Sequence, residues 1–119
     1  MNTHRIGIDL VEISDIKARL SESFTDRLLS PKERIQLTKL THPERKLQFI
    51  AGRFAAKEAY AKAYGRFETP LNFQDISIVY DPQGAPLIQT PYRSQDVVHL
   101  SISHTTHYAV AMVMIDMIE

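Results

Sequence analysis

The sequence predicts an α+β domain in which helices pack on a mostly antiparallel sheet. Three observations support this fold class. Residues 4–13 are rich in branched apolar side chains, residues 43–64 have the spacing of a long helix, and from residue 75 onward apolar and polar residues alternate with a period of two. A length of 119 residues suits one domain, which we expect to span residues 1–119.

The first strand is expected over residues 5–11, within the segment HRIGIDLVEI. Ser14 and Asp15 follow it and have the chemistry of a helix N-cap. A short helix is therefore expected over residues 16–20, with its charged side chains in water.

A stronger helix start lies at Ser30, because Pro31 follows it and Glu33 stands three residues on. This combination of a capping serine, a proline at the first helical position and a glutamate is typical of a capping box. The helix is expected to end near residue 40.

The longest helix is expected over residues 43–64. Thr41 and Glu44 repeat the start signal, and Gly65 provides the residue type that commonly ends a helix.

Strands are expected over residues 75–80, 98–102 and 108–114, where apolar side chains alternate with other residues. The segment DPQGAP at 81–86 has turn chemistry, and residues 104–107 connect the last two strands. The sheet is therefore built mainly from the second half of the chain.

The composition excludes several classes of protein. Fourteen basic and fourteen acidic residues cancel, so the chain lacks the overall positive field of a non-specific nucleic-acid binder, and we expect no nucleic-acid partner. There is no cysteine for disulfides or thiol catalysis. No segment approaches the roughly 20 apolar residues of a membrane span, so we expect no membrane association and a cytoplasmic location.

A carboxylate interrupts the apolar face of the longest helix. At about 100° per residue, Glu58 falls at the centre of a stripe formed by Leu47, Ile50, Ala51, Phe54 and Ala61. An ionised carboxylate that faces a core is costly unless it is paired or bound to a metal, so Glu58 needs a cationic partner. Lys62, four residues later, is the simplest such partner.

Basic residues beside Glu58 favour a second interpretation. Arg53 and Lys57 stand four residues apart and repel each other mildly, which indicates that an anion lies between them, and Lys46 falls on the same flank. Asp9, within an apolar strand, either faces solvent or joins Glu58 as a metal ligand. Mg²⁺ prefers few carboxylates, several waters and phosphate oxygens, so these residues suggest a metal–phosphate site.

Other charged residues have two interpretations each. His104 ends a predicted strand, where it is either a surface turn residue or a donor to a phosphate. Lys17, Arg19 and Arg27 form either a solvated face or a docking surface for an acidic protein.

Several segments together resemble the small, bacterial-type holo-acyl-carrier-protein synthase family. They are GIDLVEI at 7–13, F-x-x-R-x-L-S at 24–30, AGRFAAKEAYAKAYG at 51–65, FQDISI at 73–78 and LSISHTTHYAVA at 100–111. The resemblance runs from one end of the chain to the other, and RFAAKEAYAKAYG is its most specific part.

The resemblance implies a homotrimer with an active site in each of the three clefts between subunits. Asp9 and Glu58 would hold Mg²⁺. Coenzyme A would be bound by Arg53, Lys57, Lys62 and Gly65, and by His104 from a neighbouring subunit.

The implied reaction belongs to fatty acid biosynthesis. A serine hydroxyl of an apo acyl carrier protein attacks the β-phosphorus of coenzyme A, the 4′-phosphopantetheine group is transferred, and 3′,5′-ADP leaves. Lys62 would stabilise the developing charge and Glu58, acting through a water molecule, is the candidate base. Lys17, Arg19 and Arg27 would contact the carrier protein.

The chain departs from the family's pattern at two places. Asp15 stands where the family commonly has a basic residue that holds the carrier protein, and RFETP at 66–70 replaces a glycine-rich turn. Both differences bear on affinity and partner choice more than on the chemistry.

Two other functions stay open at this point. A binding module that recognises an acidic protein or a nucleotide without chemistry would tolerate Glu58→Gln. A structural protein would instead pair Glu58 internally with Lys62.

Overall fold

The computed structural model describes residues 3–65 and 70–118. Along the chain its elements are β1 (Thr3–Glu12), α1 (Ile13–Arg19), α2 (Glu22–Leu28), α3 (Pro31–Thr38), α4 (Pro43–Tyr64), the 3₁₀ turn η1 (Phe73–Asp75), β2 (Ser77–Tyr80), β3 (Pro86–Gln89), β4 (Val97–His104) and β5 (Tyr108–Met117). The predicted α+β class is confirmed.

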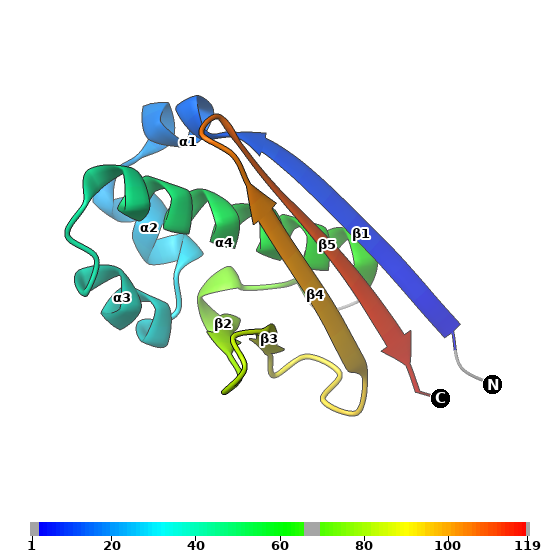
Figure 1. Ribbon diagram of the computed structural model, residues 1–119. Coiled ribbons are helices and arrows are strands. Elements are labelled where there is room, and N and C mark those ends of the chain that lie inside the picture. Colours follow the sequence, from blue (N-terminus) through cyan, green and yellow to red (C-terminus); the bar gives the residue numbers. More distant parts are fainter. Residues whose placement is uncertain (1–2, 66–69, 119) are drawn as a thin grey trace.

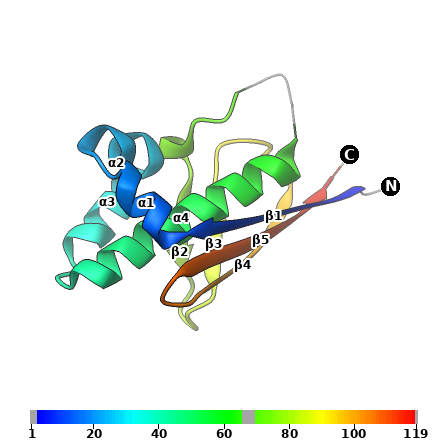
Figure 2. The same cartoon turned by 90° about the horizontal axis from the view of Figure 1, so that it is seen from above.

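The strands form two antiparallel sheets. Three strands pair in the order β1-β5-β4, and β2 pairs with β3 in a hairpin. Figures 1 and 2 show α4 lying along one face of the β1-β5-β4 sheet, with α1, α2 and α3 gathered near the N-terminal half of α4. Strand β3 was not predicted, because its four residues follow a proline-rich turn and are too few to show a clear alternation.

The contact between α4 and the sheet is made by small residues. The helix presents alanines 55, 56, 59 and 63, and β5 presents alanines 109 and 111, all of them buried. Gly7 on β1 lies directly under the helix: a Cβ atom there would lie 1.9 Å from the Ala59 carbonyl oxygen and 2.7 Å from the Ala63 nitrogen. The close approach of helix and strand therefore requires a glycine at this position.

Two of the predicted helix ends are confirmed in detail. Ser30 caps α3, accepting from the Glu33 backbone N–H at 3.3 Å, while the Glu33 carboxylate accepts from the Ser30 N–H at 3.0 Å. Gly65 ends α4 with φ of 82°, which is a conformation that favours glycine.

The predicted cap of the first helix is wrong. Helix α1 begins at Ile13, directly after β1, so Ser14 and Asp15 lie in its first turn and do not cap it. The Ile13 N–H donates to the His107 carbonyl at 2.8 Å, so the neighbouring β4–β5 turn supplies the partner that a cap would have supplied.

Thr41 was also wrongly predicted as a cap, because α4 begins after His42, which makes no side-chain cap. Helix α2 was missed altogether. Its signal was Ser21, which caps the helix by accepting from the Phe24 N–H at 3.0 Å.

We predict that Gly7→Ala destabilises the protein by roughly 2 kcal/mol or more, because the new methyl group meets backbone rather than a flexible side chain. Denaturant unfolding measures the change. Gly52→Ala in α4 is the matched control: its Cβ would lie 3.6 Å from Ile102 Cγ2, and the substitution favours a helix interior. A Gly7→Ala protein as stable as the Gly52→Ala protein would contradict the close approach.

Candidate active site

The structure brings Asp9 and Glu58 to the same region. Asp9 lies on the face of β1 that carries Gly7 and points toward α4, with its side chain 15% exposed. Lys62 Nζ donates to Asp9 Oδ1 and to the Ile8 carbonyl, both at 3.0 Å. The expected pairing of Lys62 with Glu58 is therefore replaced by pairing with Asp9.

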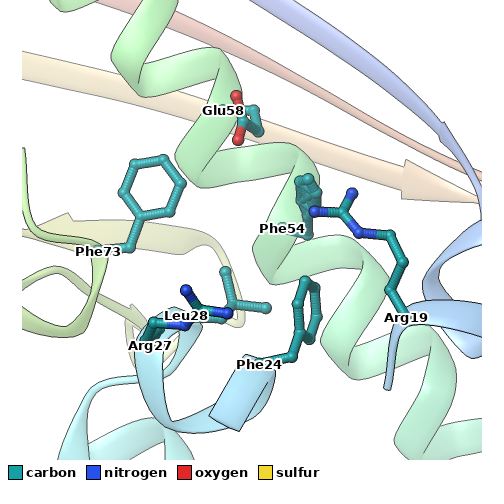
Figure 3. Close-up of a pocket in the computed structure, with 7 residues that line it drawn as sticks. All are labelled: Arg19, Phe24, Arg27, Leu28, Phe54, Glu58 and Phe73. Carbon is teal, nitrogen blue, oxygen red and sulfur yellow. The ribbon is translucent and has the colours of Figure 1, made fainter. Parts of the chain in front are cut away.

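Glu58 lies at the edge of a pocket of about 220 Å³ between α4 and the segments that cover its N-terminal half. Figure 3 shows the residues that line the pocket, which are Arg19, Phe24, Arg27, Leu28, Phe54, Glu58 and Phe73. Aromatic rings and a leucine thus form the walls, and two guanidinium groups and one carboxylate provide the charge.

Burial raises the pKa of Glu58 above its ordinary value, and the negative charge of Asp9 raises it further. The positive charges of Lys62 and Arg19 act in the opposite direction with smaller effect. The two carboxylates therefore lie close enough to repel each other, and the cations near them only partly compensate.

The prediction that Glu58 faces the core is wrong in one respect. Glu58 and Phe54 are half-buried and line the pocket, whereas the fully buried face of α4 carries alanines together with Lys57 and Tyr60. The helical periodicity correctly identified the stripe of larger apolar residues on α4. The sheet, however, approaches α4 so closely that the smallest residues of the helix, and not this stripe, pack against the sheet. The cost of burying Glu58 is accordingly that of a half-buried carboxylate.

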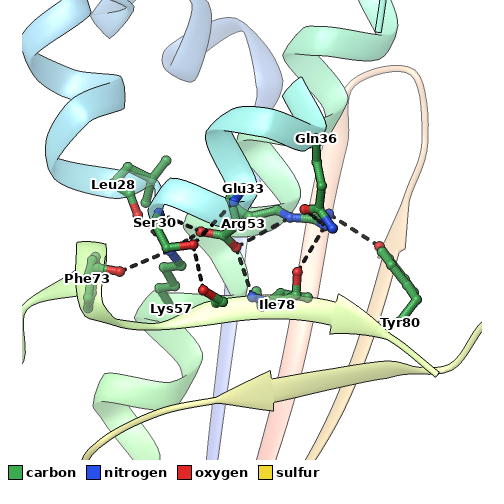
Figure 4. A network of polar contacts seen from close by, with 10 residues as sticks. Leu28, Ser30, Glu33, Gln36, Arg53, Lys57, Phe73, Ile78 and Tyr80 are labelled. Atoms are coloured by element: carbon green, nitrogen blue, oxygen red, sulfur yellow. Dashed lines mark hydrogen bonds and ion pairs between the residues drawn. The ribbon is translucent and has the colours of Figure 1, made fainter. Parts of the chain in front are cut away.

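An anion does lie between Arg53 and Lys57, and it belongs to the protein itself. Figure 4 shows the Glu33 carboxylate between them. Lys57 Nζ forms an ion pair with Glu33 Oε1, and Arg53 Nε lies 3.6 Å from Glu33 Oε2. From the sequence, Glu33 was predicted only as a capping residue, although the same carboxylate pairs with Lys57 and faces Arg53.

This position argues against the predicted contact of Lys57 with coenzyme A. The Lys57 side chain is 0% exposed, and its ammonium group also donates to the carbonyls of Leu28 at 2.6 Å and Phe73 at 3.0 Å. All three ammonium hydrogens thus have partners inside the protein. Lys46, predicted on the same flank, is exposed and lies elsewhere, beside an apolar groove near the start of α4.

Arg53 and His104 meet in a second pocket, of about 180 Å³. Arg45 and Tyr80 line it as well, and Arg53 donates to the Tyr80 hydroxyl at 3.2 Å. Arg45 was not predicted from the sequence, although its separation of eight residues from Arg53 places both on one side of α4. The resemblance assigned His104 to a site completed by a neighbouring subunit, yet here it lies beside Arg53 of the same chain.

The predicted carrier-binding residues divide into two places. Arg19 and Arg27 line the pocket that contains Glu58, and the Arg19 guanidinium lies 5.2 Å from the ring centres of both Phe24 and Phe54. Lys17 instead borders the apolar groove near the start of α4.

Of the segment RFETP, only Pro70 is among the described residues, so the predicted effect of that loop lies outside them.

No group of three or more histidine, cysteine, aspartate or glutamate side chains is arranged to hold a metal ion among residues 3–65 and 70–118. Within the same ranges, each helix is too short or too polar to cross a bilayer.

Known proteins resemble the chain over nearly all its length. The family model of the 4′-phosphopantetheinyl transferase superfamily matches residues 5–113. The chain therefore belongs to that superfamily. A holo-[acyl-carrier-protein] synthase of Geobacillus kaustophilus is 51% identical over 114 residues, covering 93% of this chain and 87% of the relative. Another, from Acholeplasma laidlawii, is 40% identical over 113 residues, covering 95% and 96%.

Solved structures agree with this assignment. A holo-(acyl-carrier-protein) synthase from Bacillus anthracis, in complex with CoA (3′,5′-ADP), superposes with a TM-score of 0.84 at 41% identity and covers 94% of this chain and 95% of its own. The Helicobacter pylori enzyme in complex with coenzyme A gives 0.75 at 36% identity, covering 92% and 98%. The predicted fold and the predicted family are confirmed.

We predict that Glu58→Gln stabilises the folded protein at neutral pH. Folding favours the neutral form of a carboxyl whose pKa it raises, and glutamine mimics that form, so we expect a gain on the order of 0.5 kcal/mol. The gain should shrink as the pH falls through the raised pKa, because the wild-type carboxyl then becomes protonated.

Denaturant unfolding at about pH 7 and about pH 5 measures both effects. Glu44→Gln is the control, because Glu44 is an exposed glutamate in the first turn of the same helix, and its loss should give no gain. A Glu58→Gln protein less stable than wild type at neutral pH would show that Glu58 is favourably paired.

Proposed function

We propose that this chain transfers the 4′-phosphopantetheine group of coenzyme A to a serine of an apo acyl carrier protein, a proposal supported by its membership of the 4′-phosphopantetheinyl transferase superfamily and by relatives named holo-[acyl-carrier-protein] synthase. One observation carries the proposal: in a chain of this family, Glu58 lines a pocket and Asp9 lies close enough for its negative charge to raise the pKa of Glu58. The structural alternative, in which Glu58 pairs internally with Lys62, is not favoured, because Lys62 pairs with Asp9.

Asp9 and Glu58 fit a magnesium ion. Mg²⁺ is commonly held by one or two carboxylates together with waters and substrate phosphates, and a half-open pocket leaves room for both. When bound, the ion supplies charge neutralisation at the diphosphate and polarises the bond to the leaving group. The dependence of transfer on magnesium is part of the proposal.

Two side chains of the protein would stabilise the leaving group and accept the proton. Lys62 is 55% exposed, so its ammonium group can turn from Asp9 to a phosphate of the coenzyme and stabilise the leaving 3′,5′-ADP. As the predicted base, Glu58 would accept the proton of the carrier's serine through a water molecule.

The coenzyme and the carrier protein contact different residues. Arg53 and His104, with Arg45, form a cationic pocket suited to the nucleotide end, and Gly65 lies at the end of α4 next to Lys62. Arg19 and Arg27 at the pocket edge, and Lys17 on the same helix as Arg19, would attract an acidic carrier. A role in fatty acid biosynthesis and a cytoplasmic location stay predictions.

Mass spectrometry tests this function directly. The protein is incubated with coenzyme A, magnesium and an apo acyl carrier protein, and the carrier is weighed. We expect the mass of phosphopantetheine to be added by wild type and by Glu44→Gln, and not by Asp9→Asn or Glu58→Gln, although all four fold. Transfer by both carboxylate variants would refute the proposed metal site, and no transfer by wild type, beside a working control enzyme, would refute the function.

The proposed homotrimer needs a surface for subunit contact, and the outer face of the β1-β5-β4 sheet is the best candidate. The helices cover only the other face. On the outer face, Ile6, Ile8 and Leu10 of β1 are 58–65% exposed and Met112 of β5 is 49% exposed. The register pairs Ile8 with Met112, so these side chains form one apolar patch.

We predict that Ile8→Lys dissociates the assembly to monomers, because a charge then stands within the apolar contact. Sedimentation or light scattering measures the mass. Ile35→Lys is a closely matched control, since Ile35 on α3 is 59% exposed and Ile8 is 58% exposed, and it should leave the mass unchanged. An Ile8→Lys protein that keeps the mass of wild type would move the subunit contact to another face.

A further inference from the structure

We propose that Lys57 is a positioning residue for the transfer pocket, holding two of its walls in place from behind. The inference rests on the proposed function, because it takes the pocket that contains Glu58 as the place where the carrier's serine is received. It assigns a role to a buried cation that the transfer chemistry itself does not use.

The contacts of the Lys57 ammonium group reach both walls. Leu28, at the end of α2, and Phe73, at the start of η1, line the pocket, and the ammonium group donates to the carbonyls of both residues at 2.6 and 3.0 Å. These two segments lie far apart in the sequence but contact each other in the fold. A single buried charge therefore joins α2 and η1 to α4.

The contact at Leu28 also completes helix α2. Leu28 is the last residue of α2, and the final carbonyls of a helix have no partner within the helix. A cation at a helix C-terminus binds such carbonyls favourably. Since α2 also carries Phe24 and Arg27 into the pocket, fixing its end fixes the side chains that the carrier protein would meet.

Glu33 holds the Lys57 ammonium group in place. Burial lowers the pKa of Lys57, and the adjacent Glu33 carboxylate opposes that effect. Glu33 is itself held by the backbone N–H groups of Ser30 and Ile78, both at 3.0 Å. The position of the ammonium group is thus set by α3 and β2, elements outside the pocket.

Neighbouring positions on α4 separate the two roles. Lys57 and Glu58 are consecutive, so their side chains leave the helix about 100° apart. Figures 3 and 4 show the outcome: Glu58 lies with the pocket residues, whereas Lys57 lies in the polar network beneath α3. The same turn of α4 therefore carries Glu58, the carboxylate of the site, and Lys57, which holds the pocket walls opposite Glu58.

Lys57→Met is the decisive substitution. It removes the wall contacts while keeping an unbranched side chain, and it leaves Arg53 and Glu33 as a balanced pair of charges. Ser30→Ala is the matched control. It removes the cap of α3 and the hydrogen bond from Ser77 Oγ at 2.6 Å, both within the same buried network. It leaves the hydrogen bonds from Lys57 to the carbonyls of Leu28 and Phe73 in place.

Two measurements are compared at temperatures that leave both variants folded. We expect Lys57→Met to raise the KM for apo carrier protein about tenfold, equivalent to about 1.4 kcal/mol, with a smaller change in kcat. Amide hydrogen exchange should also become faster in residues 22–28 and 73–75. Ser30→Ala should lower the melting temperature without either change. If Lys57→Met does not fold, Lys57→Gln, which keeps a donor, takes its place.

Unchanged exchange in the two walls, or equal KM values in the two variants, would overturn the positioning role. The exchange measurement separates this inference from the proposed function, because it does not require activity. A wild-type protein that transfers nothing refutes the function, while exchange still decides whether Lys57 holds the walls.

Discussion

The fold depends on one buried carboxylate, that of Glu33. Its Oε1 accepts from the Ser30 N–H and pairs with Lys57, and its Oε2 accepts from the Ile78 N–H and faces Arg53. Buried ion pairs stabilise a protein only where hydrogen bonds satisfy the remaining positions, and here backbone donors do so. Helices α3 and α4 and strand β2 converge on this group, and Lys57 extends its reach to α2 and η1.

Local signals in the sequence were sufficient to predict those elements whose conformation depends on residues close to each other in the chain. The capping box at Ser30, the end of α4 at Gly65 and the alternating strands all follow from short-range chemistry. The same rules failed at Ser14, because the first N–H of α1 donates to the His107 carbonyl, and at Thr41, because α4 begins one residue later, after His42. Short elements such as α2 and β3 carried too few residues for a periodic pattern.

The candidate site was predictable in its residues more than in its geometry. Glu58 was identified as a misplaced carboxylate, but its meeting with Asp9 depends on the close approach at Gly7, which no pattern within α4 reveals. Lys57 shows the opposite failure. Its charge and spacing indicated an anion correctly, yet nothing local distinguishes a ligand phosphate from the carboxylate of Glu33 on another helix.

The carboxylates of Glu33 on α3 and Glu58 on α4 differ in how completely nearby cations compensate their charge, and this difference separates a structural group from a candidate functional one. Glu33 is wholly buried with every oxygen paired, an arrangement that has no capacity for a further cation. Glu58 is half-buried beside a like charge, with Lys62 committed to Asp9 and Arg19 lying over aromatic rings. The charge of Glu58 that these cations leave uncompensated is the charge that the proposed magnesium ion would neutralise.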